Sequence, residues 1–302
     1  MTAHRIGIRH TGGGGSIPAF GRNVRPALLA LLCSSFAFAS PGHADSASPT
    51  SLTSLDNACK SLSSLRLRDT TITRAETVST GNVTYPADYK VDPGIETTYT
   101  QLPDFCRVLA TISPVPGSSI RVEMWLPEQS KWNGRFLGTG NGAFGGTIIH
   151  GALANGVKNG YAVINTDMGT FPSQLSWEGG YGYLAGIGFP QRVIDWGWRS
   201  TRLMTVVGKQ LVRSFYQQAA KHSYFAGCST GGHQALSEAQ KFPHDYEGIV
   251  AGSPGQNRTQ LHAYFSWTDL LSAKHPEYAI AAAQAQLVRK AALAQCVGKD
   301  GG

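Results

Sequence analysis

Long apolar runs, clusters of basic residues and internal repeats are all missing from this sequence of 302 residues. Its most apolar stretch, residues 27–39, is too short to span a bilayer comfortably. Lys and Arg number 26 against 19 acidic residues, but the basic residues form no run, which argues against a nucleic-acid surface. Charged residues make up only 15% of the chain and hydrophobic residues 41%, so extensive disorder is excluded and a sizeable core is possible.

Acidic residues are absent from residues 1–44, and this segment has the pattern of a secretory signal peptide. Arg22 and Arg25 precede the apolar stretch, and small residues follow it, so that cleavage is expected after Ala44 or Ala39. These features predict a secreted or periplasmic protein that has no membrane association once the signal is removed.

Cysteine is scarce, and signal cleavage would remove Cys33 from the five in the chain. The cysteines that remain are Cys59, Cys106, Cys228 and Cys296. In an exported chain such cysteines are more often bridged than free. Several connectivities are possible, and the spacing alone does not choose among them.

The middle of the chain alternates between segments with the patterns of strands and of helices. Residues 160–167 predict a buried strand, 195–218 a helix, and 223–227 a second strand. A helix over 231–242 follows, and then a strand with its turn over 248–255. This order predicts parallel strands joined by crossover helices, and therefore an α/β fold with a mostly parallel sheet and flanking helices.

Further elements are predicted on both sides of this region. Residues 45–67 are Ser-rich and predict little structure beyond one short helix around Cys59. Residues 119–127 alternate clearly and predict a strand with one apolar face. Pro276 suits the first position of a last helix over 277–294. The other predicted elements are strands over 70–79, 105–113 and 135–142 and a helix over 147–158.

The strongest catalytic signal is a serine between glycines in AGCSTGG, residues 226–232. The stretch fits G-x-S-x-G, with a predicted strand before it and a predicted helix after it, the context in which such a turn exposes a nucleophile. Ser229 is therefore the predicted nucleophile. The N–H group of Thr230, at the start of the helix, would stabilise an oxyanion, and Gly142 in an earlier glycine-rich loop would supply the second donor.

Simpler explanations exist for each of these features. Gly227 and Gly231 could serve only to let a strand and a helix approach closely. The glycine-rich loop could be an ordinary turn, and Cys228 a small buried apolar residue. A phosphate-binding loop is not an alternative, because no G-K-[ST] follows the glycines.

Over much of its length the sequence resembles the tannase and feruloyl esterase family, whose members are secreted serine esterases with an α/β-hydrolase fold. The likeness is carried by residues 195–255, which include AGCSTGG, and by FCRV (105–108), KWNGRFLGTGNGAFGG (131–146) and GYAVINTD (160–167). It covers most of the chain between the first and last cysteines of the processed protein.

The resemblance also implies how the cysteines pair. Family members have a cysteine directly before the nucleophile and another directly after the catalytic histidine, and a disulfide joins the two. Cys228 corresponds to the first of these, so its partner would lie beyond the chain end, as would the partner of Cys296. Cys59 and Cys106 would then pair with each other.

A base for Ser229 and a carboxylate that orients it are not evident in the sequence after the serine. The histidines that follow are His233, His244, His262 and His275. None precedes a cysteine, as the family's catalytic histidine does, and His233 would face away from the position of a base. Asp245, Asp269 and Asp300 lack the context of a strand end. The resemblance implies that the catalytic Asp and His follow a lid domain, beyond residue 302.

On this basis we expect a signal peptide over 1–44, the N-terminal part of the catalytic domain over 45–270 and the start of a lid domain over 271–302. The family's lid carries a structural calcium ion, and Asp300 would be at most a fragment of that site. No cofactor is expected for catalysis.

The predicted function is hydrolysis of aromatic acid esters, of the galloyl or feruloyl type, through an acyl-enzyme on Ser229. The expected partner is a small aromatic ester, and no nucleic acid. Because the base is missing, we expect the 302-residue chain to be a truncated and poorly active form. Two alternatives remain open, a serine peptidase with the same motif and a non-catalytic binding module of the same fold.

Overall fold

The structure, a computed structural model, describes residues 49–84, 98–170 and 188–296. The predicted signal peptide and Asp300 lie outside the described residues, so what was expected of them stays a prediction. Within the described part, no helix has both the length and the apolar character needed to cross a membrane.

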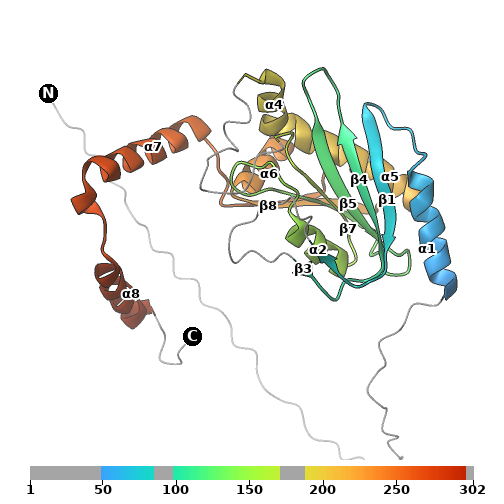
Figure 1. The fold of residues 1–302 in the computed structure, drawn as a ribbon, viewed down its shortest axis with the longest axis horizontal. Coiled ribbons are helices and arrows are strands. Elements are labelled where there is room, and N and C mark those ends of the chain that lie inside the picture. Colours follow the sequence, from blue (N-terminus) through green and yellow to red (C-terminus); the bar gives the residue numbers. More distant parts are fainter. Residues whose placement is uncertain (1–48, 85–97, 171–187, 297–302) are drawn as a thin grey trace, which may run out of the picture. The chain divides into compact units, whose positions relative to one another are not determined.

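A seven-stranded mixed sheet forms the centre of the fold (Figure 1). Its strands lie in the order β1-β4-β5-β7-β6-β8-β9. They span Thr70–Val78 (β1), Phe105–Ile112 (β4), Ile120–Pro127 (β5), Arg135–Thr139 (β6), Ala162–Thr166 (β7), His222–Cys228 (β8) and Gly248–Gly252 (β9). Strands β6, β7, β8 and β9 are parallel, and β5, β4 and β1 continue the sheet by antiparallel pairing. Most strands therefore point the same way, which confirms the predicted class of sheet. A separate two-stranded sheet joins Val83–Thr84 (β2) and Thr98–Tyr99 (β3).

Helices cover both faces of the large sheet (Figure 1). The described helices span Pro49–Leu62 (α1), His150–Lys158 (α2), Pro190–Ile194 (α4), Ser200–Tyr216 (α5), Thr230–Lys241 (α6), Arg258–Lys274 (α7) and Ala282–Cys296 (α8), with a π-helix at Asp195–Arg199 (η1) and a 3-10 helix at Pro276–Tyr278 (η2). Helices α7 and α8 contribute to neither core. One core lies between the sheet and α1, α5 and α6, and a second core lies between the sheet and α2.

Strand β5 shows why two cores form. Met124 and Leu126 belong to the core on the α5 side, as the alternating pattern predicts. Trp125 points to the opposite face and is also fully buried, in the core beneath α2. The sequence pattern predicts one apolar face, whereas the strand is buried on both, because helices pack on both faces of the sheet even where β5 pairs antiparallel with its neighbours.

Three helices differ from the predictions. The N-terminal helix α1 is longer than expected, because Leu55, Cys59 and Leu62 recur at helical spacing and bury one face of a Ser-rich segment. The helix predicted from residue 195 begins with the π-turn η1. Pro276 opens a single 3-10 turn instead of the last helix, which starts only at Ala282 because the chain is extended at Ala279.

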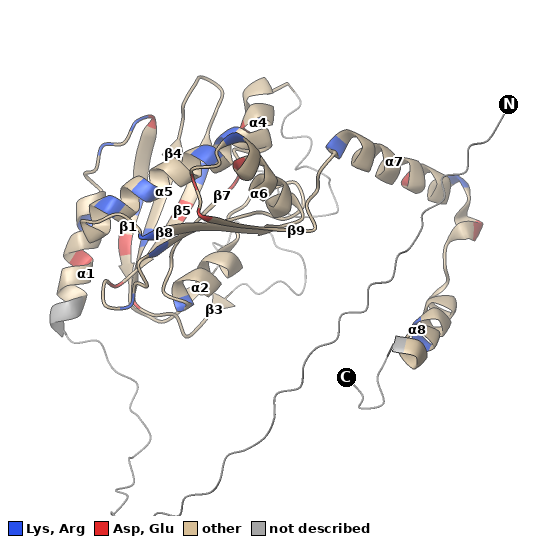
Figure 2. Cartoon of the chain, turned by 180° about the vertical axis from the view of Figure 1, so that it is seen from behind, with Lys and Arg blue, Asp and Glu red and all other residues tan. Residues whose placement is uncertain are grey.

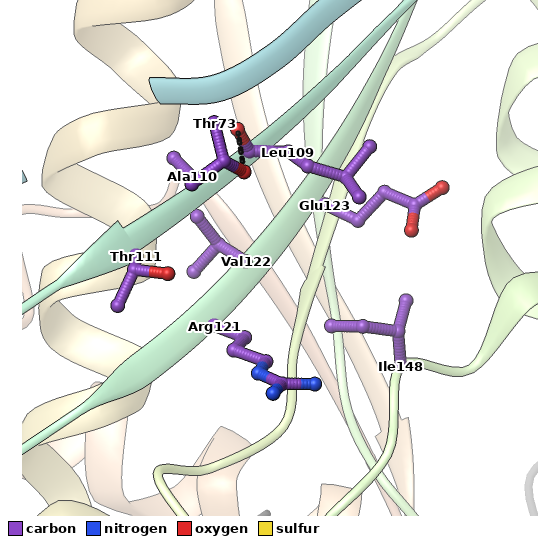
Figure 3. Close-up of a pocket in the computed structure, with 8 residues that line it drawn as sticks. All are labelled: Thr73, Leu109, Ala110, Thr111, Arg121, Val122, Glu123 and Ile148. Carbon is purple, nitrogen blue, oxygen red and sulfur yellow. Dashed lines mark hydrogen bonds between the residues drawn. The ribbon is translucent and has the colours of Figure 1, made fainter. Parts of the chain in front are cut away.

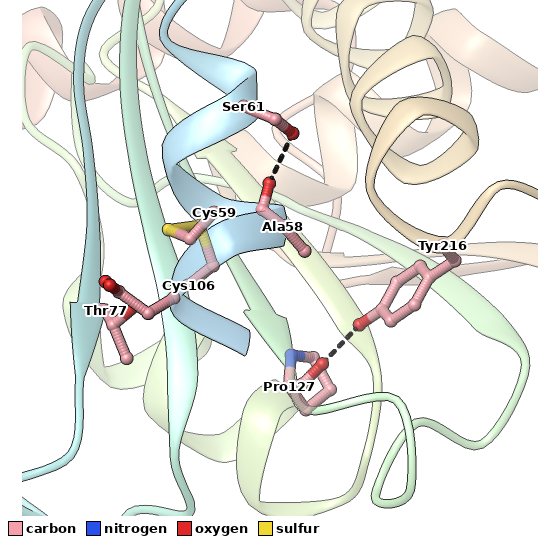
Figure 4. The surroundings of a disulfide bond; sticks show 8 residues. Ala58, Cys59, Ser61, Thr77, Cys106, Pro127 and Tyr216 are labelled. Carbon is pink, nitrogen blue, oxygen red and sulfur yellow. Dashed lines mark hydrogen bonds between the residues drawn. A yellow bond between two sulfur atoms is a disulfide. The ribbon is translucent and has the colours of Figure 1, made fainter. Parts of the chain in front are cut away.

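A disulfide between Cys59 and Cys106 fastens α1 to β4 (Figure 4). The two Cα atoms are 5.4 Å apart, and both side chains are fully buried. This is the pairing that the family resemblance implies. Nearby, the Tyr216 hydroxyl at the end of α5 donates to the carbonyl oxygen of Pro127 at 2.7 Å, so the same region is also held by a buried hydrogen bond.

One edge of the sheet, formed by β9, has no neighbouring strand among the described residues. Strand β9 is the last strand in the sheet order, and its Val250 side chain is 65% exposed. Helix α7 has no buried residue, and it runs through residue 270, where we placed the end of the catalytic domain.

Lys and Arg residues are spread over several elements, α5 among them, rather than gathered on one (Figure 2).

Candidate active site

Ser229 lies in the turn between the end of β8 and the start of α6. Its backbone angles, φ 60° and ψ −115°, are ones that residues with a side chain rarely adopt. Gly140, Gly227 and Gly231 make this turn possible, because a Cβ on any of them would lie 3.0 Å or less from backbone atoms of a neighbouring segment. The sharp turn that the motif predicts is therefore present.

Backbone hydrogen bonds fix the Ser229 turn against the end of β9. The Ser229 N–H donates to the carbonyl oxygen of Gly252, and the Ser229 carbonyl accepts from the N–H groups of His233 and Gly255, each at 3.0 Å. The Ser229 side chain is exposed. It stands at the carboxyl ends of parallel strands, the edge at which open α/β sheets bind ligands.

The two predicted oxyanion donors belong to segments that touch each other. Thr230 is the first residue of α6, so its N–H has no carbonyl one turn earlier in the helix. Residues 140–146, here named the β6 loop, follow the strand that pairs with β8. The Gly231 N–H donates to the Asn141 carbonyl at 2.7 Å. Gly142 comes next and borders open space, since no atom lies within 4 Å of the position its Cβ would take.

Asn141 and Gln234, which the sequence analysis did not single out, fix the start of the β6 loop. The Gln234 side chain on α6 accepts from the Asn141 N–H at 2.8 Å. The Asn141 side-chain amide donates to the carbonyl oxygens of Thr166 at 2.7 Å and Thr147 at 3.0 Å. Both residues are almost fully buried. The sequence offers only a weak indication of this role, since Asn141 is a polar residue between two glycines and Gln234 is a polar residue beside small residues of α6.

A second group of side chains holds the middle of the β6 loop. The Thr230 hydroxyl donates to the Ala143 carbonyl, and the Trp196 indole N–H donates to the Phe144 carbonyl at 2.9 Å. Arg258, at the start of α7, donates to the Thr230 hydroxyl at 2.9 Å. Its guanidinium carbon also lies 5.2 Å from the centre of the Trp196 ring.

None of the described histidine side chains is hydrogen-bonded to the Ser229 hydroxyl. The Nε2 atom of His233 lies 3.3 Å from the Gly197 carbonyl, and its ring stacks on Trp196. Burial, and then the charge of Arg258, lower the pKa of His233, and the same two causes lower that of His262. His262 lies beside the Phe144 ring, with the ring centres 5.9 Å apart.

Cys228 is exposed and is the free cysteine among the described residues. Nothing in the described part tests the partner that the family resemblance gives it. The Cys296 side chain and Asp300 lie outside the described part, so the pairing of Cys296 and the calcium site stay predictions. Within the described residues, no group of three or more His, Cys, Asp or Glu side chains could hold a metal ion.

A cavity of about 270 Å³ lies elsewhere, on the antiparallel part of the sheet (Figure 3). Residues of β1, β4 and β5 line it, together with Ile148. Glu123 on its wall is bonded to Arg107 at 2.7 Å and to His150 at 3.2 Å. Burial raises the pKa of Glu123, but these two partners outweigh burial and hold it at about 2. These bonds hold the buried carboxylate among β4, β5 and α2, and Glu123 is not part of the Ser229 site.

The fold and the Ser229 turn together define an α/β-hydrolase-like protein, and comparisons with known proteins agree. A family model described as tannase and feruloyl esterase matches residues 106–302. The chain belongs to the tannase and feruloyl esterase family.

Individual relatives are similar to this chain over much of its length. An uncharacterised esterase of Xanthomonas campestris is 35% identical over 247 residues, which cover 80% of this chain and 40% of the relative. Feruloyl esterase C of Talaromyces stipitatus is 31% identical and is matched over 86% of this chain and 47% of its own. The crystal structure of feruloyl esterase B from Aspergillus oryzae superposes with a TM-score of 0.60 at 31% identity, over 70% of this chain and 40% of that one. The chain therefore spans less than half the length of each of these relatives.

Proposed function

We propose that this chain carries the nucleophile of an exported esterase that hydrolyses small esters of aromatic acids. The observation that carries the proposal is the exposed Ser229 in a left-handed turn at the carboxyl edge of the sheet, with the Thr230 N–H and the β6 loop beside it. Membership in the tannase and feruloyl esterase family supports the substrate class. The buried Cys59–Cys106 disulfide supports export, because such bonds persist in oxidising compartments.

In the proposed reaction the Ser229 oxygen attacks the ester carbonyl carbon, and its proton passes to a base. The negative charge that develops on the carbonyl oxygen is stabilised by the N–H groups of Thr230 and Gly142. The ester C–O bond then breaks, the alcohol leaves with a proton, and water hydrolyses the acyl-serine to release the acid.

The rate that we expect is low, because no base for Ser229 has been identified among the described residues. No described histidine bonds to Ser229, and loss of a base from a triad lowers turnover by about a million-fold. The oxyanion donors and binding alone would leave roughly 10³-fold acceleration over water. We therefore propose that the 302-residue chain by itself is a slow esterase.

The test compares the purified chain with Ser229→Ala on methyl ferulate and methyl gallate and in labelling by a fluorophosphonate. Ser223→Ala is the matched control, because Ser223 lies at the other end of β8. We expect slow hydrolysis and slow labelling that vanish only in Ser229→Ala. Unchanged hydrolysis in that variant would overturn the proposal. Rapid turnover by the chain would instead show that a histidine within it acts as the base.

Among the described residues no histidine bonds to Ser229, and this observation also favours one other function, that of a non-catalytic module that binds aromatic esters. Equilibrium binding of methyl ferulate with neither hydrolysis nor labelling would support that alternative. Cleavage of peptides in place of aryl esters would point to a peptidase.

A further inference from the structure

Two consecutive carbonyl groups of the β6 loop are held by side chains that come from other parts of the chain. The Thr230 hydroxyl donates to the Ala143 carbonyl, and the Trp196 indole donates to the Phe144 carbonyl. Ala143 has φ 48°, a conformation that residues other than glycine adopt at a cost. The loop therefore depends on contacts from outside to keep its shape.

Arg258 contacts both of these side chains. It donates to the Thr230 oxygen, which leaves the hydroxyl proton to point at the Ala143 carbonyl. Its guanidinium also lies against the Trp196 ring, in range of a cation–π interaction. Among the described residues Arg258 forms no ion pair, and its half-buried side chain has no hydrogen-bond partner for Nε. A further guanidinium nitrogen lies 3.4 Å from Nε2 of His262, one turn along α7. The contacts of Arg258 are thus the Thr230 hydroxyl, the Trp196 ring and the His262 ring, and no carboxylate is among them.

Trp196 is itself held firmly. It follows Asp195, a fully buried residue that accepts hydrogen bonds from the Ser118 hydroxyl at 2.7 Å and from Arg199. The π-turn that carries both residues is a form that recurs at functional sites in helical segments. The His233 ring stacks on Trp196 with the ring centres 5.4 Å apart.

We propose that Thr230, Trp196 and Arg258 form a positioning network for the oxyanion donors. Through the Ala143 and Phe144 carbonyls they hold the β6 loop at the distance from α6 at which the N–H groups of Gly142 and Thr230 address one oxygen atom. The inference rests on the proposed function, since it concerns the same reaction. The side chains act through the backbone, so they affect the transition state more than substrate binding.

Amide hydrogen exchange of residues 140–146 tests the network directly. Thr230→Val removes one donor with little change of shape, and Trp196→Phe removes the other donor and keeps an aromatic ring of smaller size. Thr205→Val and Trp132→Phe are the matched controls, because they remove a bonded buried hydroxyl and a bonded indole N–H away from the loop. We expect exchange of the loop to be about ten-fold faster in the first two variants and unchanged in the controls. Equal exchange in all four overturns the inference, whether or not the chain hydrolyses an ester.

Kinetics on 4-nitrophenyl ferulate provide the second readout. In Thr230→Val we expect kcat to fall roughly ten- to a hundred-fold with KM unchanged, and Thr230→Ser, which keeps the hydroxyl, to recover part of the loss. If Ser229→Ala abolishes hydrolysis while Thr230→Val keeps the wild-type kcat, the positioning network is wrong and the proposed function stands. If Ser229→Ala has no effect, the proposed function fails, and the network with it. Where the chain shows no turnover, the exchange rates alone decide.

Discussion

The amide nitrogen of Gly231 lies 2.7 Å from the carbonyl oxygen of Asn141, and this bond joins the Ser229 turn to the β6 loop. The approach is so close that no side chain fits between the two segments. Gly140 faces Gly231 there, and a Cβ on Gly140 would overlap with the Gly231 backbone and lie 3.0 Å from the Gly227 Cα. The contact brings both predicted oxyanion donors to the same end of the sheet.

We expect Gly140→Ala to lower the free energy of unfolding by about 1–3 kcal/mol, since backbone atoms have to move to admit the methyl group. The matched control is Gly142→Ala, two residues away, where a Cβ meets no atom within 4 Å. Urea denaturation of the two variants measures the difference. Equal stabilities would show that the loop does not lie against α6 as described.

The strained turn at Ser229 predicts an unusual order of stabilities. Glycine tolerates φ 60° at no steric cost, so Ser229→Gly should be more stable than Ser229→Ala by about 1 kcal/mol. At Ser223, which lies within β8, the order should be reversed, because glycine weakens a regular strand. Thermal or urea unfolding of the four variants checks both signs, and the same order at both positions would contradict a strained nucleophile.

The disulfide should contribute strongly to stability. Cys59 and Cys106 are 47 residues apart in sequence, and closing a loop of that size restricts the unfolded chain by about 4 kcal/mol in the chain-entropy model. We expect Cys59→Ala/Cys106→Ala to lose about 2–4 kcal/mol. Peptide mapping without reductant identifies the bond itself. A peptide that joins Cys228 to either cysteine would refute the pairing.

Asp167, at the end of β7, should make stability depend on pH. Burial raises its pKa to about 7, although the N–H groups of Gly169 and Arg121 bond to one of its oxygens. The other oxygen is buried and has no hydrogen-bond partner in the part of the chain that the structure describes. The unfolded chain releases this proton near pH 4, whereas the folded protein keeps it up to about pH 7. Stability is therefore lost as pH rises through this window, and the full cost remains above it.

Asp167→Asn imitates the protonated acid and should remove that cost. We expect the variant to be more stable than the wild type at pH 8 and the gap to narrow as the pH falls toward 4. Asp195→Asn is the contrasting control, because it removes the charge opposite Arg199 and should destabilise the protein at pH 8. Urea unfolding at several pH values measures both, and a gap for Asp167→Asn that does not change with pH would disprove the assignment.

Local patterns were sufficient for the elements near the site. The period of the apolar residues predicts the strands that end at Thr166 and Cys228 and the helix between them, and G-x-S-x-G predicts the turn at Ser229. Local patterns were insufficient for elements whose form depends on packing between segments that are distant in the sequence. The Ser-rich α1 becomes a full helix because its apolar face meets the sheet, and the π-turn at Asp195 depends on partners such as Ser118.

The sequence by itself determined the class of sheet, the position of the sharp turn at Ser229 and the family, because these follow from residue periodicity and from a short motif whose parts are adjacent in the chain. Only the tertiary structure decided which residues hold Thr230 and the β6 loop in place. Asn141, Trp196 and Arg258 are far apart in sequence and carry no motif, and each bonds to the β6 loop or to α6 because the segments that follow parallel strands lie at one edge of the sheet. Hydrogen bonds between such distant segments form only once the sheet and its helices have packed.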